Sequence, residues 1–212
     1  MNKLLVTLLI GIMSTQIASA QLIKSYGIKA AFTSANQTST DWHSETYQFN
    51  RRNGLNGAIF AEWLNVPYVS VVTQVEYSQR GTRNTFLWPN NEPAPLRYVT
   101  VDNRLDYLSL LPLLKVTIPL PVVRPYLFGG PRCDILLGFK STLGWYGYDD
   151  FYNSFNRSTY GVSVGLGVEL ASILPVALIL EGRYNADIAN AYSSSSSNVR
   201  NNAYDIWLGV AF

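Results

Sequence analysis

Cysteine and histidine are nearly absent from this chain, and charge is scarce. The 212 residues include one cysteine, Cys133, and one histidine, His43. A single cysteine excludes an intramolecular disulfide, and together with a single histidine it leaves too few ligands for a zinc site, so no cofactor is expected. Charged residues make up 14% of the chain, against ~25% in soluble domains. The net charge of +2 argues against a nucleic-acid binder.

Long apolar runs are missing too. The stretch from Leu4 to Ile12 covers about nine residues, well short of the roughly 20 that a membrane helix needs, and no later stretch comes near that length. Lys3 before it and Ala18-Ser19-Ala20 after it predict a signal peptide over residues 1–20. Cleavage leaves residues 21–212 as one β-barrel domain. It also removes Lys3, which lowers the net charge from +2 to +1.

Apolar and polar residues alternate in eight stretches of the remaining chain, and this period of two is typical of β-strands. The final stretch is the clearest, because Tyr204, Ile206, Leu208, Val210 and Phe212 share one face. The eight predicted strands cover residues 24–33, 53–64, 68–78, 103–114, 125–137, 158–171, 176–185 and 204–212.

The connections between these strands alternate in length. Residues 65–67, 118–124 and 172–175 are short and contain proline, whereas residues 34–52, 80–102, 138–157 and 186–201 are long and polar. This is typical of barrels in the outer membrane of Gram-negative bacteria, which have short periplasmic turns and long extracellular loops. The predicted fold is therefore all-β, an eight-stranded antiparallel up-and-down transmembrane β-barrel. A soluble lipocalin-like binding barrel, apolar inside, is the alternative.

If the apolar parity faces lipid, the charged parity fills the lumen. This lumen set comprises Lys29, Glu62, Glu76, Arg104, Asp106, Arg132, Asp134, Glu169, Glu181, Arg183 and Asp205. Eight strands enclose a space that side chains just fill, so we expect an ionic plug rather than an open pore. Buried charges need partners, and Glu169 and Asp205 on the flanking strands are the predicted neighbours of Arg183.

Two prolines, Pro112 and Pro131, fall inside predicted strands, where proline removes a ladder hydrogen bond. Gly129-Gly130 suggests a β-bulge beside Pro131. Such a bulge would reverse the parity of Arg132 and Asp134.

Several residues are assigned to the membrane boundary and to biogenesis. The predicted interfacial aromatic girdle comprises Trp63, Tyr68, Tyr77, Tyr107, Tyr160, Tyr184 and Tyr204. Phe212 resembles the C-terminal signal that the barrel-insertion machinery reads. Arg51, Arg52, Arg80 and Arg83 lie near the outer leaflet, where arginine can grip the phosphates of lipopolysaccharide. Solvated surface charge is the competing interpretation.

One loop contains a candidate catalytic group. His43 lies beside Ser44 in the stretch Asp41-Trp42-His43-Ser44-Glu45, and some small barrels are lipid A-modifying enzymes that use such a pair. Catalysis requires the base within hydrogen-bond reach of the hydroxyl and a third, orienting group. Adjacency in a loop does not establish that geometry. We therefore predict a protein that is not an enzyme.

Short motifs spread over the chain resemble the PorT-like outer-membrane β-barrel family of Bacteroidetes. They are YGIKA at 26–30, EYSQRG at 76–81, LDYLSLLPLLK at 105–115, PYLFGGP at 125–131, YGVSVGLGVE at 160–169, RYN at 183–185 and IWLGVAF at 206–212. The resemblance implies an eight-stranded outer-membrane barrel and, as for the family's namesake, a link to protein secretion. It implies no catalytic residues. The expected partners are outer-membrane lipid, lipopolysaccharide and secretion-system components.

Overall fold

The structure is a computed structural model that describes residues 23–41, 46–64, 68–88, 97–142, 155–170, 176–193 and 197–212. The predicted signal peptide and the His43-Ser44 pair lie outside these residues. Within these ranges no helix is long and apolar enough to cross a membrane.

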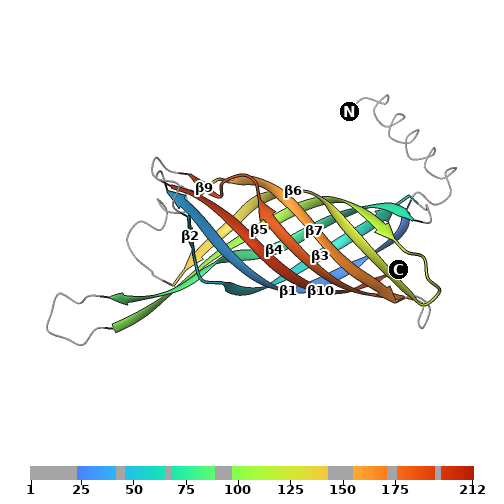
Figure 1. The fold of residues 1–212 in the computed structure, drawn as a ribbon, viewed down its shortest axis with the longest axis horizontal. Coiled ribbons are helices and arrows are strands. Elements are labelled where there is room, and N and C mark those ends of the chain that lie inside the picture. Colours follow the sequence, from blue (N-terminus) through green and yellow to red (C-terminus); the bar gives the residue numbers. More distant parts are fainter. Residues whose placement is uncertain are drawn as a thin grey trace, which may run out of the picture.

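Ten antiparallel strands form one sheet (Figure 1). Eight are long: β1 (Ile23–Asp41), β3 (Arg52–Trp63), β4 (Val69–Trp88), β5 (Arg97–Thr117), β6 (Val123–Ser141), β7 (Ser158–Leu170), β8 (Ala177–Asp187) and β10 (Ser197–Ala211). The short strands β2 (Thr46–Gln48) and β9 (Tyr192–Ser193) add to β1 and β10 at one end. The ladder between β1 and β10, from Gly27↔Ala211 to Asp41↔Ser197, closes the sheet into a barrel. The predicted eight-stranded up-and-down architecture is confirmed.

The strands extend further at the extracellular end than the sequence pattern predicts. Residues 80–102 are not a loop, because β4 and β5 stay paired as far as Trp88↔Arg97. Their neighbours stop earlier: the β3–β4 ladder ends at Gly57↔Tyr77 and the β5–β6 ladder at Asn103↔Ser141. The last backbone contacts with neighbouring segments are Arg83 N to the Asn50 carbonyl at 3.3 Å and Thr142 N to the Asp102 carbonyl at 3.1 Å. From the pair Thr85↔Thr100 onward, residues 85–88 and 97–100 form a two-stranded ribbon that projects beyond the barrel (Figure 1). Outside the membrane both ribbon faces can be polar, so the alternation that marks a strand is lost.

The two prolines do not produce the predicted bulge at Gly129-Gly130. The β5–β6 register is the same on both sides, Leu110↔Cys133 and Leu114↔Gly129, so Pro112 and Pro131 lie opposite each other and share one interrupted rung. Gly130 permits this close approach, since an added Cβ would lie 2.2 Å from the Pro112 carbonyl oxygen. The β5–β6 register instead shifts between Asp106 and Tyr107.

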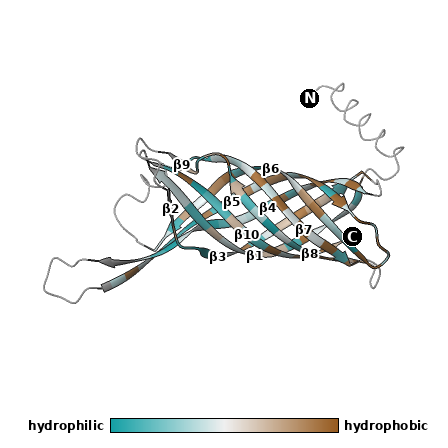
Figure 2. Ribbon diagram, viewed as in Figure 1, coloured by the Kyte–Doolittle hydropathy of each residue, from teal (hydrophilic) through white to brown (hydrophobic). Residues whose placement is uncertain are grey.

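The outer wall is apolar. Leu127, Leu166 and Leu208 are 62–64% exposed, and Figure 2 shows apolar residues gathered in the half of the barrel that carries the C-terminus. Charged side chains are buried inside, so the polarity is opposite to that of a lipocalin-like barrel. Tyr68, Tyr160 and Tyr204 are exposed, as expected for an interfacial girdle. The prediction is wrong for Tyr107, whose side chain is 0% exposed and lies in the lumen.

Candidate functional site: a sealed lumen and an extracellular cavity

Arg183 of β8 occupies the middle of the lumen. The guanidinium Nη1 donates to Glu76 Oε2 at 2.8 Å, and Nη2 donates to Gln74 Oε1 at 3.1 Å and to Glu181 Oε2 at 3.3 Å. The guanidinium carbon also lies 4.7 Å from the centre of the Trp207 ring. The contacts with Glu76 and Gln74 reach across the lumen from β8 to β4. They tie opposite walls of the barrel together.

A second ion pair lies next to this group, toward the periplasmic end. Lys29 Nζ donates to Glu181 Oε1, and the Tyr126 hydroxyl donates to the same oxygen at 2.7 Å. The Lys29 ammonium also lies 4.4 Å from the centre of the Phe60 ring. All of these side chains are buried. Glu181 therefore joins β1, β6 and β8 through charge-assisted hydrogen bonds.

Two arginines and two aspartates form a layer toward the extracellular end. Arg80 donates two hydrogen bonds to Asp134, at 2.8 and 3.1 Å. Arg132 also donates to Asp134, at 2.9 and 3.1 Å, and to Asp187. Arg80 is 2% exposed, so the expectation that it contacts lipopolysaccharide is wrong. The bidentate geometry is instead used inside the barrel.

Ion pairs also line the periplasmic end. Glu62 accepts hydrogen bonds from Lys24 at 2.6 Å, from Ser70 at 2.7 Å and from Lys115 at 2.8 Å. Lys115 also contacts Glu169 at 3.2 Å.

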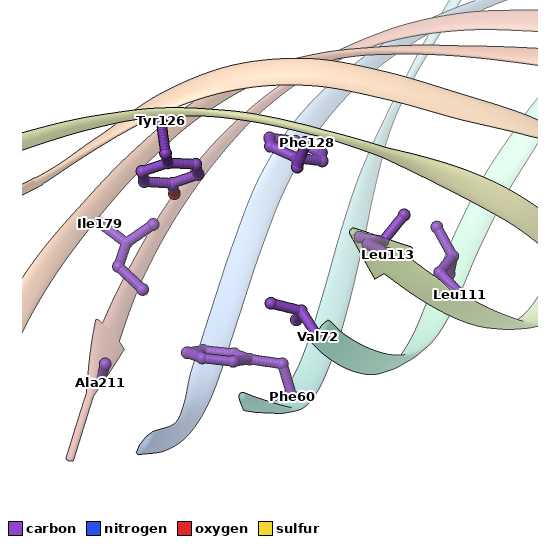
Figure 3. Close-up of a cluster of buried hydrophobic side chains, with 8 residues drawn as sticks. All are labelled: Phe60, Val72, Leu111, Leu113, Tyr126, Phe128, Ile179 and Ala211. Atoms are coloured by element: carbon purple, nitrogen blue, oxygen red, sulfur yellow. The ribbon is translucent and has the colours of Figure 1, made fainter. Parts of the chain in front are cut away.

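An apolar cluster fills the space among these charges. Figure 3 shows its eight members: Phe60, Val72, Leu111, Leu113, Tyr126, Phe128, Ile179 and Ala211. The cavity left beside them has a volume of about 10 Å³, which is room for about one water. The predicted ionic plug is therefore a mixed one, because aromatic and aliphatic side chains separate its ion pairs.

The structure brings most of the predicted lumen residues together. Those buried inside are Lys29, Glu62, Glu76, Arg132, Asp134, Glu181, Arg183 and Asp205, and Glu169 lies nearer the rim. Asp205 is a neighbour of Arg183 as predicted, because the two residues lie opposite each other in the β8–β10 ladder, but the ion pairs of Arg183 are with Glu76 and Glu181. Asp205 accepts hydrogen bonds from Thr33 and Asn185, and Glu169 pairs with Lys115 and Arg124. The alternation of the sequence predicted that the Arg183 side chain points into the lumen. It could not identify Glu76, on the opposite wall, as the ion-pair partner of Arg183.

Arg104 and Asp106 are exceptions and do not join the lumen network. On β5 the neighbouring positions Leu105 and Tyr107 are buried inside, so Arg104 and Asp106 point outward. Arg104 Nε donates to Asp106 at 2.6 Å, and Nη2 donates to the Tyr77 hydroxyl at 2.7 Å on the outer wall. The prediction that Arg104 and Asp106 face the lumen is therefore wrong. It rested on their charge alone, and this part of β5 lies toward the extracellular end, where charged groups can face outward.

Sequence reasoning missed several lumen residues. Asp187 and Lys115 lay just outside the predicted strands, and Tyr107 was placed on the other face. Extending the alternation of β8 by two residues would have found Asp187, whereas Lys115 has the parity opposite to that of Arg104 and Asp106, so the predicted parity of β5 would have placed it on the outer wall.

The extracellular end of the lumen is hollow. A cavity of about 310 Å³, here called the extracellular cavity, lies among β1, β4, β5, β10 and the residues that flank β7 and β9. Its lining includes the polar side chains of Gln37, Thr82 and Asn103 and the rings of Phe155 and Tyr192. Among the described residues, no group of His, Cys, Asp and Glu is arranged to hold a metal ion.

Comparison with known proteins identifies the family. The family model of the outer membrane protein beta-barrel domain matches residues 19–192. A search of curated proteins found no match. Among solved structures, Ail of Yersinia pestis with the heparin analogue sucrose octasulfate is 16% identical and has a TM-score of 0.46, covering 89% of this chain and 98% of that one. Neisserial surface protein A is 17% identical, with a TM-score of 0.46 and coverage of 87% and 97%. The Escherichia coli outer membrane protease OmpT is 12% identical, with a TM-score of 0.44 and coverage of 89% and 96%.

Proposed function

The chain belongs to the outer membrane protein beta-barrel domain family, whose barrels lie in the outer membrane of Gram-negative bacteria, and we propose that it is a non-enzymatic, non-conducting barrel that acts through its extracellular surface. The observation that carries this proposal is the contrast between the two ends of the lumen. The space beside the periplasmic apolar cluster measures about 10 Å³, whereas the extracellular cavity measures about 310 Å³. A solute can enter from outside but meets a packed plug.

The proposal includes contact with lipopolysaccharide. Arg51 lies on the outer wall, where its guanidinium carbon is 4.7 Å from the centre of the exposed Tyr204 ring. An arginine above an interfacial tyrosine is at the right height to meet phosphate groups of the outer leaflet. Arg83 is exposed as well, whereas Arg52 is paired with Asp102 at 2.7 Å. Arg51 and Arg83 are thus the better candidates.

A finer assignment is the PorT-like, secretion-associated role. The resemblance in sequence motifs supports it, and the projecting β4–β5 ribbon offers an extracellular element that a partner could contact. Native co-purification from outer membranes, with and without the ribbon, tests this assignment. Partners that are lost with the ribbon would support it.

The test of the central proposal is electrical. Purified barrel inserted into a planar lipid bilayer should give no stable conductance steps, while an open porin in the same bilayer serves as the positive control. Reproducible single-channel steps would contradict the sealed lumen. The non-enzymatic part is tested by lipid A mass spectra, which should be identical in hosts expressing the wild type and His43→Ala. An acyl change that depends on His43 would make the protein an enzyme.

A further inference from the structure

The extracellular cavity has an uncharged lining, although it lies directly above a layer of paired arginines and aspartates. No charged residue occurs among its lining residues within the described part of the chain. A charged ligand would lose its hydration there without gaining a counter-charge, which is costly. The cavity is therefore suited to a neutral ligand.

Polar and apolar side chains both line this cavity. The strands β1, β4 and β5 contribute the polar part, Gln37, Ser39, Thr82, Asn84 and Asn103, together with the apolar Val101. Phe155, Tyr192 and Val199, next to β7, β9 and β10, form the aromatic part, and Phe49 also lines the cavity. A ligand that fills the space must therefore present both hydrogen-bonding groups and an apolar face.

The aromatic part is held in place by its own packing. Phe155 stacks on Phe139 with ring centres 5.4 Å apart, and Tyr192 lies 5.7 Å from Phe155. A β-bridge joins Phe155 to Tyr192, and Asn156 N donates to the Ala191 carbonyl at 2.9 Å. These contacts fix the rings before any ligand arrives, which lowers the entropy cost of binding.

The polar part retains both donors and acceptors. Gln37 uses its amide nitrogen to reach Asn201 at 3.0 Å, which leaves its carbonyl oxygen to accept. Asn84 uses its carbonyl oxygen to accept from Asn50 N at 3.0 Å, which leaves its amide nitrogen to donate. A hydroxyl group both donates and accepts, so it matches this arrangement. A hydrocarbon would leave these amides without partners.

We propose that the extracellular cavity binds a neutral saccharide of one or two rings, with hydroxyls toward Gln37, Asn84 and Asn103 and a ring face against Tyr192 and Phe155. The volume of about 310 Å³ lies at the lower end of the range for small-molecule sites, about 300–1,000 Å³. This proposal rests on the extracellular role proposed above and names its ligand class. The saccharide can come from two sources, a free disaccharide or the terminal sugars of a surface polysaccharide.

Saturation-transfer NMR on the full barrel tests the proposal. The protein is refolded in lauryl dimethylamine oxide, because maltoside and glucoside detergents carry competing sugar headgroups. The probes are maltose, lactose, N-acetylglucosamine and the polysaccharide released from host lipopolysaccharide by mild acid, with 1-decanol as the apolar probe and glucose 6-phosphate as the charged one. A neutral sugar should give ring-proton signals that titrate to saturation.

The variants Asn103→Ala and Tyr192→Leu separate the two parts of the site. Asn103→Ala should weaken sugar binding by about three- to tenfold, as expected for a lost neutral hydrogen bond. Tyr192→Leu should weaken it by roughly tenfold, because buried aromatics dominate binding. Asn53→Ala, on the outer wall of β3, is the matched control and should leave binding unchanged. Heat-modifiable migration of every variant on a gel shows that each one folds.

Saturation by a free disaccharide assigns the ligand to a solute, and saturation by the polysaccharide alone assigns it to a surface glycan. Either result supports the proposal. Absence of sugar signals in folded wild type, preference for 1-decanol or glucose 6-phosphate, or sugar binding by Asn103→Ala and Tyr192→Leu as strong as that of the wild type overturns it. None of these results bears on ion conduction. If the saccharide proposal fails, the proposed non-conducting role is still decided by the planar-bilayer measurement.

Discussion

The periplasmic and extracellular halves of the barrel use the same eight strands in different ways. In the periplasmic half, ion pairs and the apolar cluster around Phe60 and Phe128 leave a cavity of about 10 Å³. In the extracellular half, the strands continue past the packed layer and surround about 310 Å³. The periplasmic half is therefore packed across the lumen, whereas the extracellular half encloses the space for which we propose a ligand.

The comparison also explains where charge lies. Within the sealed half, buried charges such as Lys29 and Arg183 each contact at least one carboxylate, as burial in low dielectric requires. Near the extracellular end charge can also face outward, as Arg104 and Asp106 do. The side of the wall on which a charged residue lies thus depends on its height in the membrane.

The largest expected effect comes from breaking the middle of the plug. Arg183→Met removes the cation that faces Glu76 and Glu181, and leaves both carboxylates in a buried site. We expect a loss of about 3–5 kcal/mol in the free energy of unfolding. Urea titration of the barrel refolded into lipid vesicles measures it.

Arg104→Met is the matched control on the outer wall. The side chains of Arg104 and Asp106 are 27% and 12% exposed, against 0% and 2% for Arg183 and Glu76, so the expected loss is below about 1 kcal/mol. Equal losses for Arg183→Met and Arg104→Met would contradict the difference between the plug and the outer wall.

The next effect concerns the lipid-facing wall. Leu208 is 64% exposed and lies midway between Tyr204 and Phe212, which are about 27 Å apart along the strand at roughly 3.4 Å per residue. Leu208 thus lies near the bilayer midplane, and Leu208→Arg should cost about 2–4 kcal/mol. The same urea titration in vesicles detects it.

Leu178→Arg places the same charge near the periplasmic boundary, because Leu178 pairs with Val210 near the C-terminal end of β10. This substitution should lower the free energy of unfolding by about 0–1 kcal/mol. A larger loss for Leu178→Arg than for Leu208→Arg would show that the membrane boundaries are misplaced.

The smallest effect is expected from shortening the ribbon. Replacing residues 86–99 by Asn-Gly joins Thr85 and Thr100, which pair directly, through a turn that suits a two-residue hairpin. Because β3 and β6 do not flank this segment, the unfolding free energy should change by less than about 1 kcal/mol. Loss of folding on shortening would mean that the ribbon supports the barrel.

Sequence periodicity predicted the barrel well because lipid imposes it. Wherever a strand crosses hydrocarbon, as in β7 and the end of β10, one face must be apolar, and the alternation is strict. It predicted the extracellular parts poorly because water places no such demand on either face. Residues 80–102 therefore looked like a loop, although most of them are paired strand.

The candidate site divides in the same way. The sequence by itself determined the strand number and the inward direction of Lys29, Glu62, Glu76, Glu181 and Arg183, since parity is a local property of an extended chain. Only the tertiary structure decided that Arg183 forms its ion pair with Glu76 rather than with Asp205 beside it, that Arg104 faces out, and that a cavity whose described lining is uncharged opens above the plug. Those outcomes depend on which side chains reach across the closed barrel, a distance in space that no local pattern encodes.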